Sequence, residues 1–328
     1  MILNDKTANG RIIGRVLYID KSGTYVYNQR TERIEIYKEY FEPIFIYQLL
    51  NAPQIRNKII KQSQGNTQIF VNWNGIKNTD YLVPNKTEQI RIGELFTNLD
   101  NLITLHQRKC DKLVELKSSL LEKMFPKNSS NIPEIRFKGF TDVWEQRKLT
   151  SFVEFYNGQT YSPLNVQDRG TLVLRSSNVQ NGEISKDDLV FIDSDVVNTN
   201  NVEIGDIIVV VRNGSRNLIG KHAQIKGKMT DTVIGAFMTG IRSKNPEFVN
   251  SLLNTRIFDD GINKNMGATI NQITGYMFSN MEFKIPTNDE QSKIGELFTN
   301  LDNLITLHQR KLEKLNNIKK SMLDKMFV

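Results

Sequence analysis

Three short polar segments of this chain carry side chains of the kind that proteins use to read nucleic acids. They are Arg175-Ser176-Ser177-Asn178, Arg212-Asn213-Gly214-Ser215-Arg216 and Asn263-Lys264-Asn265. Arg and Lys suit guanine, Asn and Gln suit adenine, and Ser or Thr hydroxyls suit phosphate oxygens. Any one segment could be an ordinary polar turn, but three of them in a basic domain favour binding. The candidate nucleic-acid contacts are Arg175, Ser177, Asn178, Arg212, Asn213, Ser215, Arg216, Lys221, Asn263, Lys264, Asn265 and Thr269, with Thr67 and Gln68 nearer the front of the chain.

Motifs for catalysis are missing from the same region. The segment from Gly214 to His222 resembles a phosphate-binding loop, but it has one residue too many between its glycines and a His where Ser or Thr should hold magnesium. Neither an Asn-Pro-Pro-Tyr motif nor a glycine fingerprint for a nucleotide cofactor occurs. The acidic pairs Asp187-Asp188 and Asp259-Asp260 have no basic partner at a nuclease-like spacing. We therefore expect no catalysis, cofactor or metal in this chain.

Composition sets the broad class. A length of 328 residues with 39% hydrophobic content is enough for two domains with real cores. The formal charge of +7 suggests an anionic partner, most simply nucleic acid. No segment approaches the roughly 20 apolar residues that span a bilayer, and the first residues lack a signal-peptide layout. With Cys110 as the only cysteine, we expect a cytoplasmic protein without membrane association.

One string, IGELFTNLDNLITLHQRK, occurs twice without a change, from Ile92 to Lys109 and from Ile294 to Lys311. The offset, 294 − 92 = 202, is far longer than the roughly 20 to 50 residues of solenoid repeats, so the repeat indicates a duplicated domain with its connector. The front of the chain aligns with the back half of the later domain at this offset. The stretch from Trp144 to about Gly205 has no counterpart there.

Each copy has apolar residues at heptad spacing, which predicts two long helices that pack against each other within one chain. Possible capping boxes lie at Asn85 to Glu88 and at Asn288 to Gln291. His106 and His308 interrupt the seam, and polar residues that fix the register explain them better than metal ligands do, because neither has a second ligand nearby. The predicted seam consists of Ile92, Leu95, Leu99, Leu102, Leu113, Leu116 and Leu120, and of Ile294, Leu297, Leu301, Leu304, Leu315, Ile318 and Met322.

Between the helices, the sequence predicts an α+β domain. Strand patterns occur in TLVLRSSNV, GDIIVVV, HAQIKG and MEFKIP, and NPEFVNSLLNTRIFDD has the pattern of a helix.

These features together resemble the specificity subunit of type I restriction-modification systems over essentially the whole chain. The residues that carry the resemblance are the lead-ins Pro84 to Ile92 and Pro286 to Ile294, the repeated helices, and the EIRFKGFTDVWEQRKL segment from Glu134. The resemblance implies two target recognition domains, the first incomplete, joined and separated by an antiparallel coiled coil. The corresponding boundaries are 1–86 (partial first domain), 87–125 (first helix), 126–143 (linker and lead-in), 144–287 (complete second domain) and 288–328 (second helix).

The resemblance also implies the partners. The chain would read a bipartite site in double-stranded DNA and hold modification subunits, which methylate adenine with S-adenosylmethionine, while restriction subunits add cleavage with ATP and magnesium. The alternatives are a coiled-coil scaffold with protein- or carbohydrate-binding ends, a defective shortened specificity subunit, and, less well supported, a stand-alone DNA enzyme. Because the two helices are nearly identical, one chain's second helix could replace another's first, so a homodimer is also possible.

Overall fold

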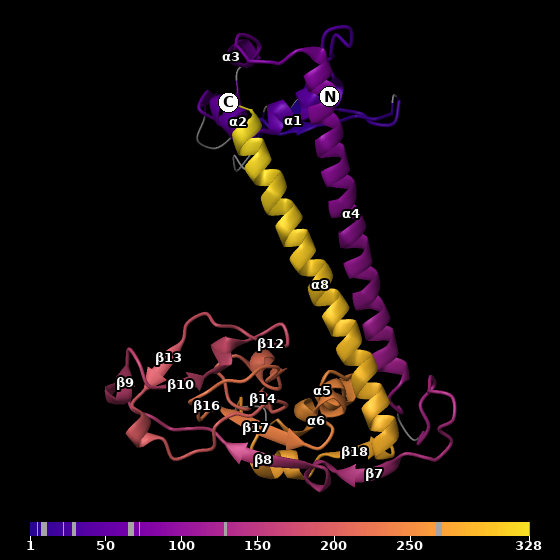
Figure 1. Cartoon of the computed structure of the whole chain (residues 1–328), viewed down its shortest axis with the longest axis vertical. Coiled ribbons are helices and arrows are strands. Elements are labelled where there is room, and N and C mark those ends of the chain that lie inside the picture. The colour runs from indigo at the N-terminus through magenta and orange to yellow at the C-terminus, as the bar shows by residue number, and fades with distance from the viewer. Residues whose placement is uncertain are drawn as a thin grey trace. The chain divides into compact units, whose positions relative to one another are not determined.

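The structure is a computed structural model that describes residues 1–4, 6–7, 12–21, 23–27, 31–64, 69–71, 73–127, 130–266 and 271–327. The chain divides into two compact units. Unit 1 comprises Met1–Lys112 and Ile305–Val328, and unit 2 comprises Leu113–Leu304. Two long helices, α4 (Lys86–Lys123) and α8 (Asn288–Met326), contribute to both units (Figure 1). None of the helices in the described ranges has the length and apolar character needed to cross a membrane.

Unit 2 is built on two four-stranded sheets. The first has the antiparallel order β15-β14-β17-β8, and the second has the order β16-β10-β13-β9, in which β10 and β16 run parallel. Two short pairs, β18 with β7 and β11 with β12, complete the strands. The bounds are β7 (Glu145–Lys148), β8 (Val153–Asn157), β9 (Val166–Gln167), β10 (Thr171–Leu174), β11 (Val179–Gln180), β12 (Glu183–Ile184), β13 (Val190–Ile192), β14 (Ile207–Val210), β15 (His222–Gln224), β16 (Thr232–Ile234), β17 (Met238–Ser243) and β18 (Glu282–Ile285).

Helices α5 (Pro246–Leu253), α6 (Arg256–Asn265) and α7 (Gly275–Ser279) complete unit 2. The segment NPEFVNSLLNTRIFDD is helical, as predicted, and it forms two helices, α5 and the beginning of α6. Thr255 has extended backbone angles, and its hydroxyl accepts a hydrogen bond from the Phe258 amide, so it begins a new helix instead of continuing the old one. The expected strand TLVLRSSNV is shorter than predicted, because a 3-10 turn over Ser176–Asn178 follows β10.

The core of unit 2 is aromatic. Trp144, Phe248 and Phe298 are almost fully buried, and all three surround the Phe125 ring at centroid distances of 5.8 to 6.3 Å. α8 approaches α5 so closely that a Cβ at Gly295 would lie 2.8 Å from the Phe248 backbone nitrogen. A side chain at this position would push the two helices apart, so glycine permits the contact.

Unit 1 has smaller sheets. Their orders are β3-β1-β4 and β2-β6-β5. The strands are β1 (Ile2–Asn4), β2 (Lys6–Thr7), β3 (Val16–Leu17), β4 (Thr31–Arg33), β5 (Ser63–Gln64) and β6 (Ile69–Val71), and the helices are α1 (Pro43–Asn51), α2 (Pro53–Ile60) and α3 (Trp73–Lys77). The buried rings of Phe45, Phe96 and Phe327 lie at the centre, with Phe327 5.5 and 5.8 Å from the other two.

Unit 1 repeats the back half of unit 2. The order β3-β1-β4 matches β15-β14-β17, and α1, α2 and α3 match α5, α6 and α7. Gly14 and Gly220 have positive φ in both units and face Ile59 and Ile262, respectively. Among the described residues, unit 1 has no equivalent of β7 to β13. The α+β fold with an incomplete first domain is therefore as predicted.

The two long helices run antiparallel within each unit, as predicted. In unit 1, Lys319 Nζ lies 2.6 Å from Asp100 Oδ1, and in unit 2 the corresponding ion pair, Lys117 to Asp302, has the same distance. His106 Nδ1 and His308 Nδ1 are 2.8 Å apart in unit 1. One imidazole must donate and the other accept, so the pair is a polar contact between the helices.

The predicted seam is wrong for Leu95, Leu102, Leu116 and Leu304, which are 36%, 44%, 47% and 44% exposed. The chain buries the row that begins at Phe96 and its counterpart Phe298 in place of the row that begins at Leu95. Both rows repeat every seven residues, and the large rings of Phe96 and Phe298 fill the domain cores. The other predicted seam residues are buried or half-buried: Ile92, Leu99, Leu113, Leu120, Ile294, Leu297, Leu301, Leu315, Ile318 and Met322.

The two helix starts also differ from each other. Asn85 Oδ1 accepts a hydrogen bond from the Glu88 amide at 3.0 Å, as predicted for a residue that caps the start of α4. The second predicted capping box is wrong, because the Gln291 amide bonds to the Thr287 carbonyl, and Asn288 lies inside the helix with its side chain bonded to Asn245.

Candidate nucleic-acid interface

The ends of two strands from different sheets meet at one surface of unit 2. β10 leads into the Ser176 turn and β14 leads into the Arg212 segment. Asn213 Nδ2 donates to Ser176 Oγ at 3.1 Å, and its backbone amide donates to the Asn271 carbonyl at 3.3 Å. Asn271 Nδ2 in turn donates to the Gly214 carbonyl at 3.0 Å. Two of the three predicted polar segments are thus joined, together with residues 271–272.

Arg212 is an exposed cation whose position this arrangement fixes. Its guanidinium carbon lies 5.2 Å from the centroid of the Phe237 ring, and both side chains are exposed. The backbone amides of Val211 and Arg212 both donate to the Phe237 carbonyl, at 2.9 and 3.2 Å, and Arg212 bridges to Gln272. A cation–π contact orients the guanidinium plane while leaving its N–H groups directed outward.

Three other predicted residues beside Arg212 are accessible. Ser177, Ser215 and Arg216 are exposed. The Ser215 amide donates to Asn213 Oδ1 at 2.9 Å, which shapes the turn that presents the Ser215 hydroxyl and the Arg216 side chain. The Nδ2 and Oδ1 atoms of Asn213 both have hydrogen-bond partners within the protein. Asn213 therefore stabilises the loop, and its side-chain amide is not directed at a ligand.

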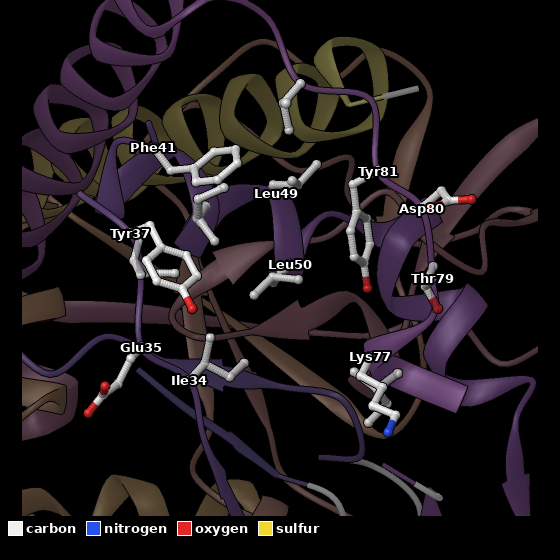
Figure 2. Close-up of a pocket in the computed structure, with 14 residues that line it drawn as sticks. Ile34, Glu35, Tyr37, Phe41, Leu49, Leu50, Lys77, Thr79, Asp80 and Tyr81 are labelled. Atoms are coloured by element: carbon white, nitrogen blue, oxygen red, sulfur yellow. The ribbon is translucent and has the colours of Figure 1, made fainter. Parts of the chain in front are cut away.

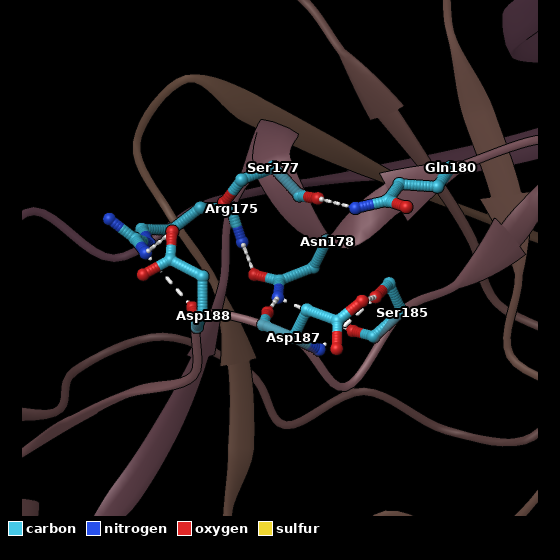
Figure 3. A network of polar contacts seen from close by, with 7 residues as sticks. All are labelled: Arg175, Ser177, Asn178, Gln180, Ser185, Asp187 and Asp188. Atoms are coloured by element: carbon cyan, nitrogen blue, oxygen red, sulfur yellow. Dashed lines mark hydrogen bonds and ion pairs between the residues drawn. The ribbon is translucent and has the colours of Figure 1, made fainter. Parts of the chain in front are cut away.

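The prediction that Asn178 contacts bases is wrong for this structure. The residue is fully buried, and its side chain makes three internal hydrogen bonds (Figure 3). Oδ1 accepts from the Arg175 amide at 2.9 Å, and Nδ2 donates to the carbonyls of Ser185 and Asp187 at 3.3 and 2.8 Å. Its amide donors and its carbonyl oxygen are consumed in holding the turn after β10.

Arg175 also has a partner within the protein. Its Nη2 lies 2.6 Å from Asp188 Oδ2 and 2.9 Å from the Asp188 carbonyl oxygen (Figure 3). Asp188 has a positive φ of 52°, and this contact supports that strained turn. In the described conformation, Arg175 is bound to Asp188 instead of being directed at a ligand.

The remaining candidates lie on other elements. Lys221 is exposed just before β15, and Asn263 and Lys264 are exposed on α6. Asn265 Nδ2 donates to the Gly261 carbonyl one turn earlier at 2.8 Å. The predicted contacts Thr67, Gln68 and Thr269 lie outside the described residues.

Sequence reasoning missed Phe237, Asn271 and Gln272. The available signal for Phe237 was the Gly235-Ala236 interruption in an otherwise apolar run, because a turn there leaves the next aromatic ring outside the sheet. Asn271 and Gln272 contact the Arg212 segment only through the tertiary fold.

The environment of one acidic pair perturbs a side chain. Burial, followed by the neighbouring Asp260, raises the pKa of Asp259. Within the described ranges, no group of three or more His, Cys, Asp or Glu residues could hold a metal ion.

Residues 141–317, more than half of the chain, match the family described as type I restriction modification DNA specificity domain. The chain belongs to this family. Over 94% of its length it is 21% identical to the type I restriction enzyme MjaVIII specificity subunit of Methanocaldococcus jannaschii, of which it covers 74%. The StySPI specificity subunit of Salmonella potsdam is 26% identical over 54% of this chain and 40% of that protein.

Solved structures resemble this specificity-domain protein in fold. A type I restriction-modification S subunit from M. genitalium has a TM-score of 0.60 at 16% identity, covering 100% of this chain and 82% of that one. The HsdS subunit from Thermoanaerobacter tengcongensis has a TM-score of 0.51 at 18% identity, covering 88% of this chain and 71% of that one. At these identities the likeness establishes the shared fold alone.

Proposed function

We propose that this specificity-domain protein binds double-stranded DNA through unit 2 and reads one half of a bipartite target with the surface around Arg212. The observation that carries this proposal is the assembly of the Ser176, Arg212, Phe237 and Asn271 segments into one exposed surface with an oriented guanidinium. Arg212 would bond to a guanine edge, Phe237 would contact an apolar base surface such as the thymine methyl group, and Ser177, Ser215 and Arg216 would contact phosphates or bases.

In the same proposal, the chain has no catalytic role. Modification subunits that bind α4 and α8 would supply S-adenosylmethionine and methylate adenine, and restriction subunits would add ATP- and magnesium-dependent cleavage. The exposed leucines of the repeated helices, Leu95, Leu102, Leu116 and Leu304, support this assignment, because rows of exposed leucines on long helices are suited to protein partners.

The direct test is to express the chain with the modification subunit of its own system and to sequence methylated adenines in unmethylated genomic DNA treated with the purified complex. A single recurrent motif is the expected result. Methylation without any motif, or co-purification with no methylation at any ratio of the subunits, would contradict the proposal.

The salt dependence of DNA affinity distinguishes a DNA-binding protein from a scaffold. A protein that neutralises phosphates releases counterions, so its affinity for DNA must fall steeply between about 50 and 200 mM salt. A scaffold that does not bind DNA would give no such titration.

A further inference from the structure

One edge of strand β4 in unit 1 is unpaired among the described residues, whereas the equivalent edge of β17 in unit 2 is paired with β8. In unit 2, β8 pairs with β17 from Thr239–Asn157 to Ser243–Val153. β4 is the equivalent of β17, and among the described residues it pairs with β1 alone. The Ile34 amide donates to the Met1 carbonyl of the neighbouring strand. Because amides along a strand point alternately to its two sides, the amides of Arg33 and Glu35 face the open edge.

An apolar cavity of about 370 Å³ lies beside this edge. Figure 2 shows the side chains of Ile34, Leu50 and Tyr81 around one space, and Ile76 also contributes to the lining. Since a cavity of about 150 Å³ holds benzene, this one has room for roughly two aromatic side chains. A second hollow of about 620 Å³ lies along Ile34 and Ile36, so the edge is flanked by space.

The duplication identifies what covers the equivalent surface. Ile34 and Ile76 correspond to Ile241 and Phe278 of unit 2. There, Phe155 of β8 is paired in register with Ile241, and its ring lies 5.8 Å from that of Phe278. Trp144 and Leu149, from the same 144–157 segment, are also buried in the core of unit 2. The cavity of unit 1 therefore corresponds to the place that the 144–157 segment fills in unit 2.

We propose that the β4 edge and its cavity bind a strand that resembles residues 144–157 and that none of the described residues of unit 1 supplies. The strand would supply backbone hydrogen bonds to the β4 edge and apolar side chains at the Leu149, Val153 and Phe155 positions. A second copy of this chain is a poor donor, because its own Leu149 and Val153 are buried in unit 2 and could leave only by unfolding that core.

Charge distinguishes the partner strand from the chain's own segment. Arg242 of β17 lies opposite Glu154 of β8, but the equivalent of Arg242 in unit 1 is Glu35. Like charges directly opposite each other destabilise a strand pair. The partner strand therefore carries a basic residue at the position of Glu154.

The test uses the full chain and two synthetic peptides of residues 143–158, one with the natural Glu154 and one with Glu154→Lys. We expect saturable binding of both in fluorescence anisotropy, roughly two- to five-fold tighter for the Lys peptide at low salt. Hydrogen exchange should slow at Arg33 and Glu35. A Phe155→Asp peptide should not bind.

A cavity-filling variant of the chain is the matched control. Ile76→Phe places the side chain of Phe278 into the cavity, so it should abolish peptide binding while thermal unfolding remains cooperative. Equal binding by this variant, or protection confined to unit 2, would overturn the proposal. Concentration-dependent protection of Arg33 and Glu35 without peptide would identify a second copy as the occupant and would also overturn it. DNA is not used in these measurements, so their failure leaves the proposed function unaffected.

Discussion

In the proposed DNA-binding surface, the contact between Arg212 and Phe237 would restrain the guanidinium before DNA binds. A long, flexible side chain loses rotamer entropy when it binds a ligand, and a ring that already restrains it reduces that loss. The same ring is exposed and offers its own apolar surface. The positions of both side chains are fixed by the Val211 and Arg212 backbone amides, which donate to the Phe237 carbonyl.

Replacing Arg212 by Ala should lower affinity for the specific DNA site by about 1 to 3 kcal/mol and affect random DNA much less. The matched control is Arg147→Ala, which removes the same charge from an exposed residue of β7 that is paired with Glu145. Competition titrations with specific and random duplexes measure both values. Equal losses on the two duplexes would make Arg212 a phosphate contact instead of a base contact.

Asn178 should act on stability instead. In an Asn178→Asp variant, a carboxylate oxygen would face the carbonyl oxygens of Ser185 and Asp187 in place of an amide donor. The free energy of unfolding should fall by about 1 to 3 kcal/mol or more, because buried groups would be left unsatisfied. Denaturant unfolding measures the change. Ser177→Ala, one residue away and exposed, should be close to neutral, and a similar loss in both variants would contradict this reading.

At the scale of elements, α4 and α8 place the same sequence in two equivalent environments. Phe96 packs against Phe327 in unit 1, and Phe298 packs against Phe125 in unit 2. The ion pairs of Asp100 and Asp302 repeat in the same way. These contacts of one unit can therefore be compared directly with the equivalent contacts of the other.

The corrected seam makes a prediction with a built-in comparison. Leu301 is 6% exposed and Leu304 is 44% exposed on the same helix of unit 2. Leu301→Ala should destabilise by about 2 to 5 kcal/mol, and Leu304→Ala by about 0.5 kcal/mol or less. Chemical denaturation of the two variants measures this. Similar decreases in the free energy of unfolding for the two variants would show that Leu304 is buried between the helices after all.

His308 should make stability depend on pH. Burial, followed by the charges of His106, Lys109 and Lys311, lowers the pKa of His308. The unfolded chain therefore binds protons more readily than the folded one, so stability is full above the ordinary His pKa of about 6.5 and is lost as pH falls below it.

Unfolding titrations between about pH 7.5 and 5.5 test this dependence. A variant with His106→Gln and His308→Gln should have a shallower slope than the natural chain. Some slope should remain, because burial also lowers the pKa of His222. An unchanged slope in the double variant would assign the whole pH dependence to other groups.

At the scale of the whole molecule, the duplication makes parts of the chain interchangeable. A fragment of residues 134–328 lacks Phe125, which is buried in the core of unit 2 beside Phe298. Phe327 of another fragment carries the equivalent ring, and its Lys319 could pair with Asp302 as Lys117 does. We therefore expect the fragment to dimerise through exchanged α8 helices.

Sedimentation of that fragment over a range of concentrations measures the association. Phe327→Ala should weaken the dimer, and with modification subunits the natural fragment should direct methylation at a site whose halves are inverted copies. A monomeric fragment with a cooperative unfolding transition would show that unit 2 does not need the Phe125 position filled.

The antiparallel pairing of the two long helices was predicted from the resemblance to a known family. The sequence alone determined the two helices themselves, the α+β class and the incomplete first domain. These features follow from local periodicity and from the repeat, which are properties of the chain itself. Periodicity could not choose between the Leu95 row and the Phe96 row, because both recur every seven residues and only the contacting core selects one.

The tertiary structure decided which polar residues face outward. Ser177 and Asn178 are neighbours of similar polarity, yet one is exposed and the other is buried by contacts with Ser185 and Asp187. Phe237 joins Arg212 because β14 and β17 are adjacent in one sheet. Such contacts link residues far apart in the chain, so no local pattern reports them, and the candidate site could be predicted only in part.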